Sequence, residues 1–303
     1  MQRVYWITGF KGFIGKHLSR HFLAKGVSVI HVQTTESNLV LYSPITKNFV
    51  ELLWDSHPSI LQDFTPSHVL HFGLKGRLTP GDPEIHYKNF QLSLKLAKFI
   101  FKLDNPVRVL FAGTIDEYGG ENFPNENHSI KERFLTPYAL YKYKSGEVIS
   151  DTFHGSIHEF VHMRICNIFG EGQRVTTLLH AVLNPAVKTL KVNDLNYFRD
   201  LMWVEDLVQN VYLLSQIQYP GRLINVGSGR SVLMREFVEA TWRSQGKVTS
   251  DLVIPDSPQN FTSQFKPHMN IDLVSRLLGR TYVNTGLNEF LKTIGKSRGT
   301  LIH

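Results

Sequence analysis

Residues 8–15 of the chain read TGFKGFIG, between an apolar run at Val4–Thr8 and a stretch that carries Leu18 and Phe22 at helical spacing. In such a strand, loop and helix, the first glycine permits a tight turn, the second lets the backbone approach a pyrophosphate, and the third allows close helix packing. The helix N-terminus then attracts the phosphate charge. The stretch therefore predicts a dinucleotide-binding unit at the start of the chain. Its expected contacts are Gly9, Phe10, Lys11, Gly12, Phe13, Ile14 and Gly15.

Four more apolar runs follow at the spacing of a strand and helix repeat. They are Val27–Val32, His68–Phe72, Val107–Ala112 and Phe160–Ile165. Each run is almost continuously hydrophobic, which is typical of strands covered on both faces. Helical spacing between the runs is found in Phe13–Lys25, Pro83–Leu103 and Pro137–Asp151. We therefore expect an α/β fold with a Rossmann-type, doubly wound parallel sheet.

The second half of the chain predicts a smaller lobe. The strand and helix rhythm is lost after about Gly170, then returns at Leu223–Val226 and in a helical stretch from Leu233 to Trp242. We expect an NAD(P)-binding domain over residues 1–169 and a substrate-binding C-terminal lobe over residues 170–303. Of the lobe's sequence, about residues 200–227 are expected to return to the first domain.

Composition excludes several classes of protein. Among 303 residues, 33 Lys and Arg exceed 26 Asp and Glu, giving a net charge of +7 that favours an anionic partner such as a nucleotide. The basic residues are scattered, so no nucleic acid partner is expected. Cys166 is the single cysteine, and no apolar run approaches the roughly 20 residues of a membrane helix. We expect a cytoplasmic protein that has no disulfide and does not interact with a membrane.

Three histidines recur at four-residue intervals, at His154, His158 and His162. Gly155 and the strand-like run after Phe160 interrupt any helix that could present all three on one face. No metal site is therefore expected.

The end of the second strand bears on the choice of dinucleotide. An Asp or Glu at this place binds the ribose hydroxyls in NAD-specific sites, whereas Gln33 and Thr34 stand here. A 2′-phosphate would not be repelled, and Lys11 could pair with it. NADP(H) is therefore favoured over NAD(H), which stays open because Glu36 is close enough to contact a ribose. Asp55 is a candidate to face the adenine.

A tyrosine and a lysine are spaced for proton transfer. Tyr138 and Lys142, in the stretch YALYK, share one face of an expected helix, where an ammonium group can lower the pKa of a phenol. Thr114 follows the run Val107–Ala112, at the sheet edge where ligands bind in open α/β folds. These three side chains are the candidate catalytic group.

Several motifs in this order resemble those of the extended short-chain dehydrogenase/reductase family, which contains nucleotide-sugar epimerases, dehydratases and reductases. Besides TGFKGFIG and YALYK, Thr114 stands four residues before Tyr118-Gly119, as in the family. The family's Arg-x-x-Asn is similar to Arg164–Asn167. Its later motifs are similar to the segments Arg199–Asp206 and Asn225–Gly229.

The resemblance implies roles for individual residues. Tyr138 exchanges a proton with the sugar oxygen, Lys142 holds the nicotinamide ribose, and Thr114 hydrogen-bonds the reacting oxygen. The substrate contacts that we expect are Asp116, Asn167 and Arg199, the last two at the nucleotide diphosphate. The family's His-Leu-Ala-Ala is replaced by His71-Phe72-Gly73-Leu74, so Phe72 and Gly73 are expected to reshape the nicotinamide pocket. The resemblance also implies a homodimer formed by the helices of Pro83–Leu103 and Pro137–Asp151.

The stretch Gly113–Gly119, GTIDEYG, bears on the reaction. Dehydratases of the family place Asp and Glu directly after the Thr, whereas here Ile115 intervenes. This register is more similar to that of the GDP-4-keto-6-deoxyhexose reductases. The resemblance favours NADPH-dependent reduction of the C4 ketone of a nucleotide-linked 4-keto-6-deoxysugar, with Tyr138 as proton donor. An NAD-dependent nucleotide-sugar 4-epimerase is the main alternative, ahead of a dehydratase or a non-catalytic dinucleotide-binding regulator.

Overall fold

The computed structural model describes residues 3–74, 81–173, 178–184, 186–192, 194–219, 221–254, 266–279, 282–286 and 289–292. The chain forms two compact units. The first unit contains Met1–Gly120, Glu126–Ile165 and Val208–Asn225. The second contains Glu121–Asn125, Cys166–Leu207 and Val226–His303.

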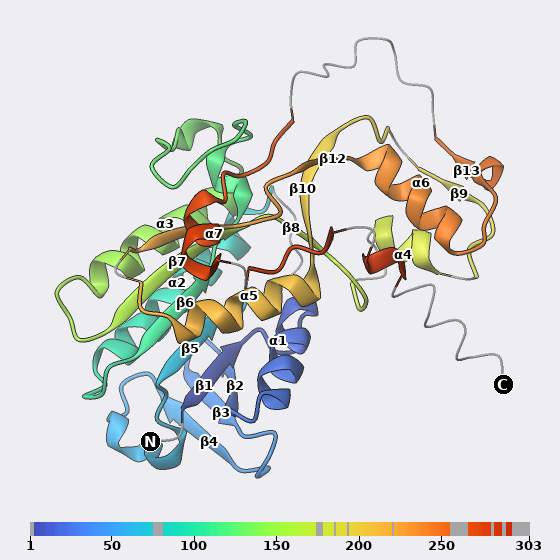
Figure 1. Cartoon of the computed structure of the whole chain (residues 1–303). Helices are drawn as coiled ribbons and strands as arrows, with labels where there is room; N and C mark the ends of the chain where they lie inside the picture. The colour runs from blue at the N-terminus through green and yellow to red at the C-terminus, as the bar shows by residue number, and fades with distance from the viewer. Residues whose placement is uncertain are drawn as a thin grey trace. The chain divides into compact units, whose positions relative to one another are not determined.

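The first unit is built on an eight-stranded sheet with the order β11-β7-β6-β5-β1-β2-β3-β4 (Figure 1). The strands that continue the glycine-loop pattern pair in parallel, with Thr8 level with both Val32 and His71. Their carboxyl ends therefore meet at one edge of the sheet. These predicted strands are present as β1 (Val4–Thr8), β2 (Ser28–Thr34), β5 (His68–His71), β6 (Arg108–Ala112) and β7 (Glu159–Ile165), and β11 spans Leu223–Val226.

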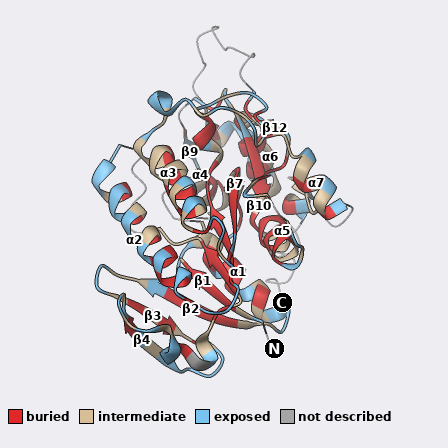
Figure 2. Cartoon of the chain, turned by 90° about the vertical axis from the view of Figure 1, so that its left-hand side faces the viewer, coloured by how far each residue is buried: buried red, intermediate tan, exposed pale blue. Residues whose placement is uncertain are grey.

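Helices cover both faces of this sheet. On one face, α2 (Pro83–Phe101) packs along α3 (Pro137–Thr152) (Figure 2). On the other face, α1 (Phe13–Ala24) contacts α5 (Val204–Gln216), where the rings of Phe22 and Tyr212 lie 5.3 Å apart. The predicted doubly wound α/β architecture is confirmed.

Side-chain caps explain where α2 and α3 begin. The carboxylate of Asp82 accepts hydrogen bonds from the amides of Glu84 and Ile85, and Pro83 follows in the first helical turn. Thr136 accepts from the amide of Ala139 in the same way, before Pro137. Both caps pair amides that a helix start leaves without partners, so the two helix starts are encoded locally.

One edge of the sheet departs from the expected all-parallel arrangement. The strands β3 (Asn38–Tyr42) and β4 (Phe49–Leu53) form an antiparallel hairpin beside β2. In β3, burial alternates, with Leu39 and Leu41 inward. Alternation of this kind is typical of antiparallel strands with one covered face. Residues 39–42 read LVLY, so the sequence itself does not alternate, and only the burial of these side chains does.

The core of the first unit fills the space between the sheet and its helices. Fully buried side chains in this core include Trp6, Leu39, Leu41, Leu61 and Val69. Short 3-10 helices join the larger elements at η1 (Pro58–Phe64), η2 (Ile115–Tyr118) and η3 (Glu132–Phe134). The element η2 directly follows β6 and carries Asp116.

The second unit has a three-stranded sheet in the order β12-β10-β8. Its core centres on the fully buried Trp242 of α6, packed with Phe169, Phe237 and Phe290. Its strands are β8 (Asn167–Phe169), β9 (Leu190–Lys191), β10 (Phe198–Trp203), β12 (Ser231–Leu233) and β13 (Leu252–Val253). Its other helices and turns are α4 (Leu178–Leu183), α6 (Met234–Ser244), η4 (Thr249–Asp251) and α7 (Asp272–Leu278). Across the described ranges of both units, no helix has the length and apolar character needed to cross a membrane.

Candidate active site

The glycine loop is shaped by close backbone approaches. Gly9 has a φ of 71°, and a Cβ on it would lie 2.7 Å from the carbonyl oxygen of Phe72. A Cβ on Gly15 would lie 2.1 Å from the carbonyl oxygen of Gly9. The amide of Gly12 donates to that same Gly9 oxygen at 2.8 Å and closes the turn before α1. Because the first turn of α1 contains no acidic residue, its positive end is available to an anion.

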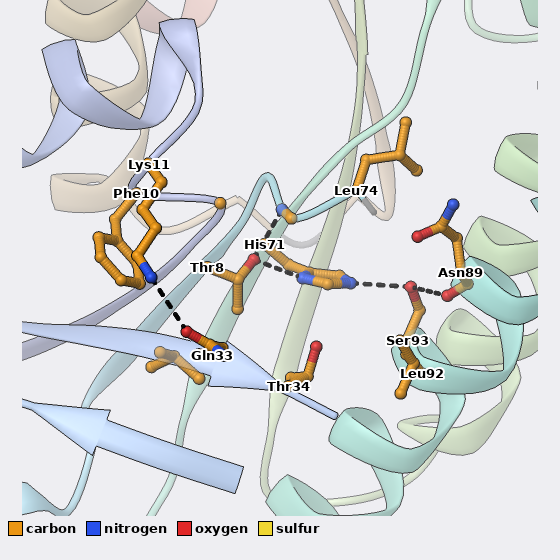
Figure 3. A pocket seen from close by; sticks show the side chains of 13 residues that line it. Thr8, Phe10, Lys11, Gln33, Thr34, His71, Leu74, Asn89, Leu92 and Ser93 are labelled. Atoms are coloured by element: carbon orange, nitrogen blue, oxygen red, sulfur yellow. Dashed lines mark hydrogen bonds between the residues drawn. The ribbon is translucent and has the colours of Figure 1, made fainter. Parts of the chain in front are cut away.

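A cavity of about 300 Å³ lies beside this loop, at the carboxyl ends of β1, β2 and β5 and against α2 (Figure 3). This volume is at the lower end of the range for small-molecule sites, about 300–1,000 Å³. The structure thus brings together predicted contacts from three separate strands. The lining residues are Thr8, Gly9, Phe10, Lys11, Val32, Gln33, Thr34, His71, Gly73, Leu74, Asn89, Leu92 and Ser93.

Lys11 and Gln33 meet at the outer part of this cavity (Figure 3), where the lysine Nζ donates to the glutamine Oε1 at 3.3 Å. The ring of Phe10 stacks on His31, with centroids 4.3 Å apart. His31 contacts Ser19 Oγ at 2.6 Å, and burial lowers the pKa of the imidazole. A flexible cation thus lies next to an aromatic pair, an arrangement suited to a phosphate beside a planar base.

A hydrogen-bonded chain crosses the floor of the cavity (Figure 3). The Ser93 hydroxyl donates to the carbonyl oxygen of Asn89 at 2.9 Å, so it accepts from Nε2 of His71, also at 2.9 Å. On the other side, Thr8 Oγ1 accepts from the amide of Gly73 at 2.8 Å and donates to Nδ1 of His71 at 2.7 Å. Burial lowers the pKa of His71 to about 3. The imidazole is therefore neutral and held in its Nε2–H form, which ties the ends of β1 and β5 to α2.

The remaining predicted cofactor residues do not line this cavity. The segment Gly12–Gly15 contains the helix cap and the first residues of α1. Phe72 contributes its carbonyl oxygen, which packs against Gly9. Asp55 is exposed in the turn after β4.

Lys142 is buried on α3 and borders a narrow space that also includes Tyr138. Its Nζ donates to the carbonyl oxygen of Ala112 at 2.7 Å and lies 5.0 Å from the ring centre of Phe111. Burial lowers the pKa of Lys142 to about 8, against the opposing charge of Glu117. The narrow space shares Leu74, Asn89 and Ser93 with the larger cavity, so the two adjoin.

The pKa of Tyr138 differs from the sequence expectation, which is a pKa lowered by Lys142. Burial raises the pKa of its phenol well above the ordinary value, and the carboxylates of Asp116 and Glu117 add to this increase. A hydrogen bond with Thr114 acts in the opposite direction but is outweighed. Lys142 is not among the groups that shift the pKa of Tyr138, and its ammonium group donates to the carbonyl oxygen of Ala112. The phenol therefore keeps its proton at neutral pH.

Thr114 is buried at the end of β6, where its backbone and side chain both cap η2. Its Oγ1 accepts from the amide of Asp116 at 3.3 Å, and its own amide donates to Glu117 Oε1 at 2.9 Å. Because the hydroxyl oxygen accepts from the backbone, its proton can be donated to another oxygen. The side chain of Asp116 is exposed.

Two predicted substrate contacts belong to the second unit. The side-chain amide of Asn167 donates to the carbonyl oxygen of Asp200 at 3.3 Å, and Arg199 stacks over the ring of Tyr197. Their roles toward a substrate stay predictions.

The three histidines spaced four residues apart have different surroundings. His162 contacts Glu117, His158 accepts a hydrogen bond from the amide of Val107, and His154 contacts Arg222. Within the described ranges, no group of three or more His, Cys, Asp or Glu is arranged to hold a metal ion. Cys166 is buried, and burial raises the pKa of its thiol well above the ordinary value.

The family model named NAD dependent epimerase/dehydratase family matches residues 5–227. The match includes the glycine loop, Thr114, Tyr138 and Lys142. Among curated proteins, dTDP-6-deoxy-L-talose 4-dehydrogenase (NAD(P)(+)) of Kitasatospora kifunensis is 23% identical over 262 residues, covering 82% of this chain and 81% of the relative.

Two solved structures illustrate the likeness of fold. UDP-glucose 4-epimerase of Thermotoga maritima, solved with UDP-glucose, is 20% identical with a TM-score of 0.74, over 98% of this chain and 99% of that one. RMD from Pseudomonas aeruginosa, complexed with NADPH, is 19% identical with a TM-score of 0.73, over 99% of this chain and 100% of that one. At these identities the likeness shows the fold alone, and the expected Rossmann-type fold is confirmed.

Proposed function

Because the chain belongs to the NAD dependent epimerase/dehydratase family, we propose that it is an NADPH-dependent reductase of a nucleotide-linked 4-keto-6-deoxysugar. The extended short-chain dehydrogenase/reductase character predicted from the motifs is confirmed by the same match. The reaction adds a hydride to the C4 carbonyl carbon and a proton to its oxygen, which produces a secondary alcohol. The observation that carries the proposal is the placement of Tyr138 and Lys142 along one narrow space, with the phenol hydrogen-bonded to Thr114 at the end of β6.

The surroundings of the carboxylates support a reductase over a dehydratase. Glu117 is fully buried and occupied by Arg164 and His162, so it is not available to remove a proton from a sugar. Asp116 is exposed and raises the pKa of Tyr138. With Glu117 held in this way, the pair does not provide both the acid and the base that elimination of water requires.

In this reaction, each candidate residue of the chain would have a separate role. When bound, the dinucleotide supplies the hydride. Tyr138 donates its proton to the ketone oxygen as negative charge develops there, and Thr114 donates a hydrogen bond to the same oxygen. Lys142, which has a pKa of about 8, is largely protonated at neutral pH and would hold the nicotinamide ribose.

The cavity fits the adenosine end of NADP(H). The glycine loop and the N-terminus of α1 would receive the pyrophosphate. Lys11 and Gln33 would receive the 2′-phosphate, and no carboxylate is among the lining residues described for this cavity. Glu36 is the residue for which NAD(H) stayed an alternative, since its carboxylate could contact a ribose. It is exposed, and its backbone oxygen accepts a hydrogen bond from Lys95.

The test is a turnover assay with purified protein. We would mix it with NADPH, or NADH in parallel, and with dTDP-, GDP-, CDP- and UDP-linked 4-keto-6-deoxysugars, and follow the loss of reduced-nicotinamide absorbance. Faster oxidation of NADPH than of NADH with one of these sugars is the expected result. No oxidation, together with NAD bound to the purified protein and inversion at C4 of a nucleotide sugar, would replace the reductase by the 4-epimerase.

We also propose that the protein is a homodimer that associates through α2 and α3. The rings of Tyr87, Phe90 and Tyr141 group on these helices, with Tyr141 centred 5.9 Å from Tyr87 and 6.2 Å from Phe90. Tyr87 is 46% exposed, which leaves apolar surface for a partner. Light scattering after size exclusion should give twice the chain mass, and Tyr87→Glu should give a monomer.

A further inference from the structure

A buried carboxylate lies directly behind the candidate catalytic group. Glu117 is 0% exposed, and its Oε1 accepts from the backbone amide of Thr114 at 2.9 Å. The same oxygen lies 3.1 Å from Nε2 of His162, and Oε2 accepts from Nε of Arg164 at 2.8 Å. The carboxylate therefore links the loop after β6 to two side chains of the neighbouring strand β7.

Two glycines make room for this cluster. A Cβ on Gly113 would lie 2.2 Å from Nε2 of His162, and a Cβ on Gly146 would lie 2.1 Å from Nδ1 of the same ring. Gly113 directly precedes Thr114. Gly146 follows Lys142 by four residues on α3, so it shares the helix face of Tyr138 and Lys142. The imidazole is thus packed between the two segments that carry the catalytic candidates.

Burial of a carboxylate in such a place is costly unless its partners are well placed. Burial alone would raise the pKa of Glu117, but His162 and Arg164 outweigh this effect and hold the pKa below its ordinary value. Glu117 is therefore an anion at neutral pH. A similar link between β6 and β7 exists at their other end, where the buried Arg108 donates to the half-exposed Glu159 at 2.7 Å. Joining the two strands thus does not by itself require a fully buried carboxylate.

We propose that Glu117 is a positioning residue of the reductase, which fixes Thr114 against Tyr138 through the Thr114 amide and supplies the negative charge that faces Lys142. The proposal rests on the proposed function for the roles of Thr114, Tyr138 and Lys142. It assigns no contact between Glu117 and the substrate.

The charged and titratable neighbours of Lys142 define the expected effect on pH dependence. They are Glu117 on η2, His71 at the end of β5 and Tyr138 on α3, while Asp116 and His86 lie nearer Tyr138. Glu117 raises the pKa of Lys142, whereas burial lowers it. Removal of the Glu117 charge therefore makes Lys142 lose its proton at a lower pH.

Two variants separate geometry from charge. Glu117→Gln should lower kcat about a hundredfold and move the basic limb of the pH profile to lower pH, with the KM of the sugar changed little. Glu117→Asp keeps the charge but is shorter, so it should lower kcat about tenfold and leave the basic limb in place. Glu159→Gln is the matched control, because it neutralises the half-exposed carboxylate that pairs with Arg108 between the same strands, and it should leave kcat and the basic limb unchanged.

A second readout does not depend on turnover. Heteronuclear NMR of the Lys142 side chain across a pH series, with its signal assigned by Lys142→Arg, gives its pKa in the wild type and in Glu117→Gln. A lower pKa in the variant is expected even if no 4-keto sugar is a substrate, so failure of the proposed function is distinguishable. If the pKa of Lys142 is unchanged in folded Glu117→Gln, the proposal that the Glu117 carboxylate acts on Lys142 through its charge is wrong. A kcat within about twofold of the wild type in Glu117→Asp would overturn the positioning role.

Discussion

Replacement of Gly15 by alanine should weaken dinucleotide binding through a displacement that the structure specifies. The added Cβ would lie 2.1 Å from the carbonyl oxygen of Gly9 and 2.6 Å from its carbonyl carbon. A normal carbon–oxygen contact needs about 3.3 Å, so the loop or α1 must move by about 1 Å. Both neighbours are backbone atoms, which cannot turn away as a side chain could.

The displaced groups are those expected to receive the pyrophosphate. A shift of this size should raise the Kd of NADPH about tenfold or more, which corresponds to about 1.4 kcal/mol. Kd would be measured from the change in nicotinamide fluorescence on titration, and folding would be checked by circular dichroism. The control is Gly81→Ala, because a Cβ on Gly81 meets no atom within 4 Å. A folded Gly15→Ala protein that binds NADPH as tightly as Gly81→Ala would refute the reasoning.

Three further outcomes test the site. Tyr138→Phe should lower kcat by about 10²–10⁴-fold because the proton donor is lost, while the Kd of NADPH stays near the wild-type value; unaltered turnover would remove Tyr138 from the mechanism. Lys11→Ala should raise the Kd of NADPH about tenfold but leave that of NADH unchanged, and equal effects on both would contradict a 2′-phosphate contact. The value of kcat/KM should fall as pH rises above about 8, since the pKa of Lys142 is lowered to about 8 and its cationic form is lost above that pH. A basic limb that Lys142→Arg does not move to higher pH would show that another group titrates there.

Local sequence patterns were enough to predict the main elements of the first unit. The strand at Val4–Thr8 and the helix starts at Phe13, Pro83 and Pro137 agree with the structure, because continuous apolar runs, capping residues and prolines act over a few residues. The hairpin of β3 and β4 was missed, since its alternating burial depends on β2 beside it.

The candidate site also has features that the sequence predicts and features that only the folded chain shows. Tyr138 and Lys142 could be paired from the sequence because a helix places residues four apart on one face. The protonation of Tyr138 could not, since burial and the carboxylates of η2 raise its pKa only in the folded chain. The chain carries one weak sequence signal for the hydrogen bonds of His71, namely that His71–Leu74 differs from the family's His-Leu-Ala-Ala. The partner of His71, Ser93, lies 22 residues away on α2 and could not be predicted.

By itself, then, the sequence determined the parallel Rossmann-type architecture, the glycine loop and the spacing of the phenol and ammonium groups. All of these depend on neighbours within a turn or a strand. The tertiary structure alone decided that Glu117 meets His162 and Arg164, which follow it by 45 and 47 residues. The physical reason is that β6 and β7 pair side by side, so the charges behind the site come from strands that only folding brings together.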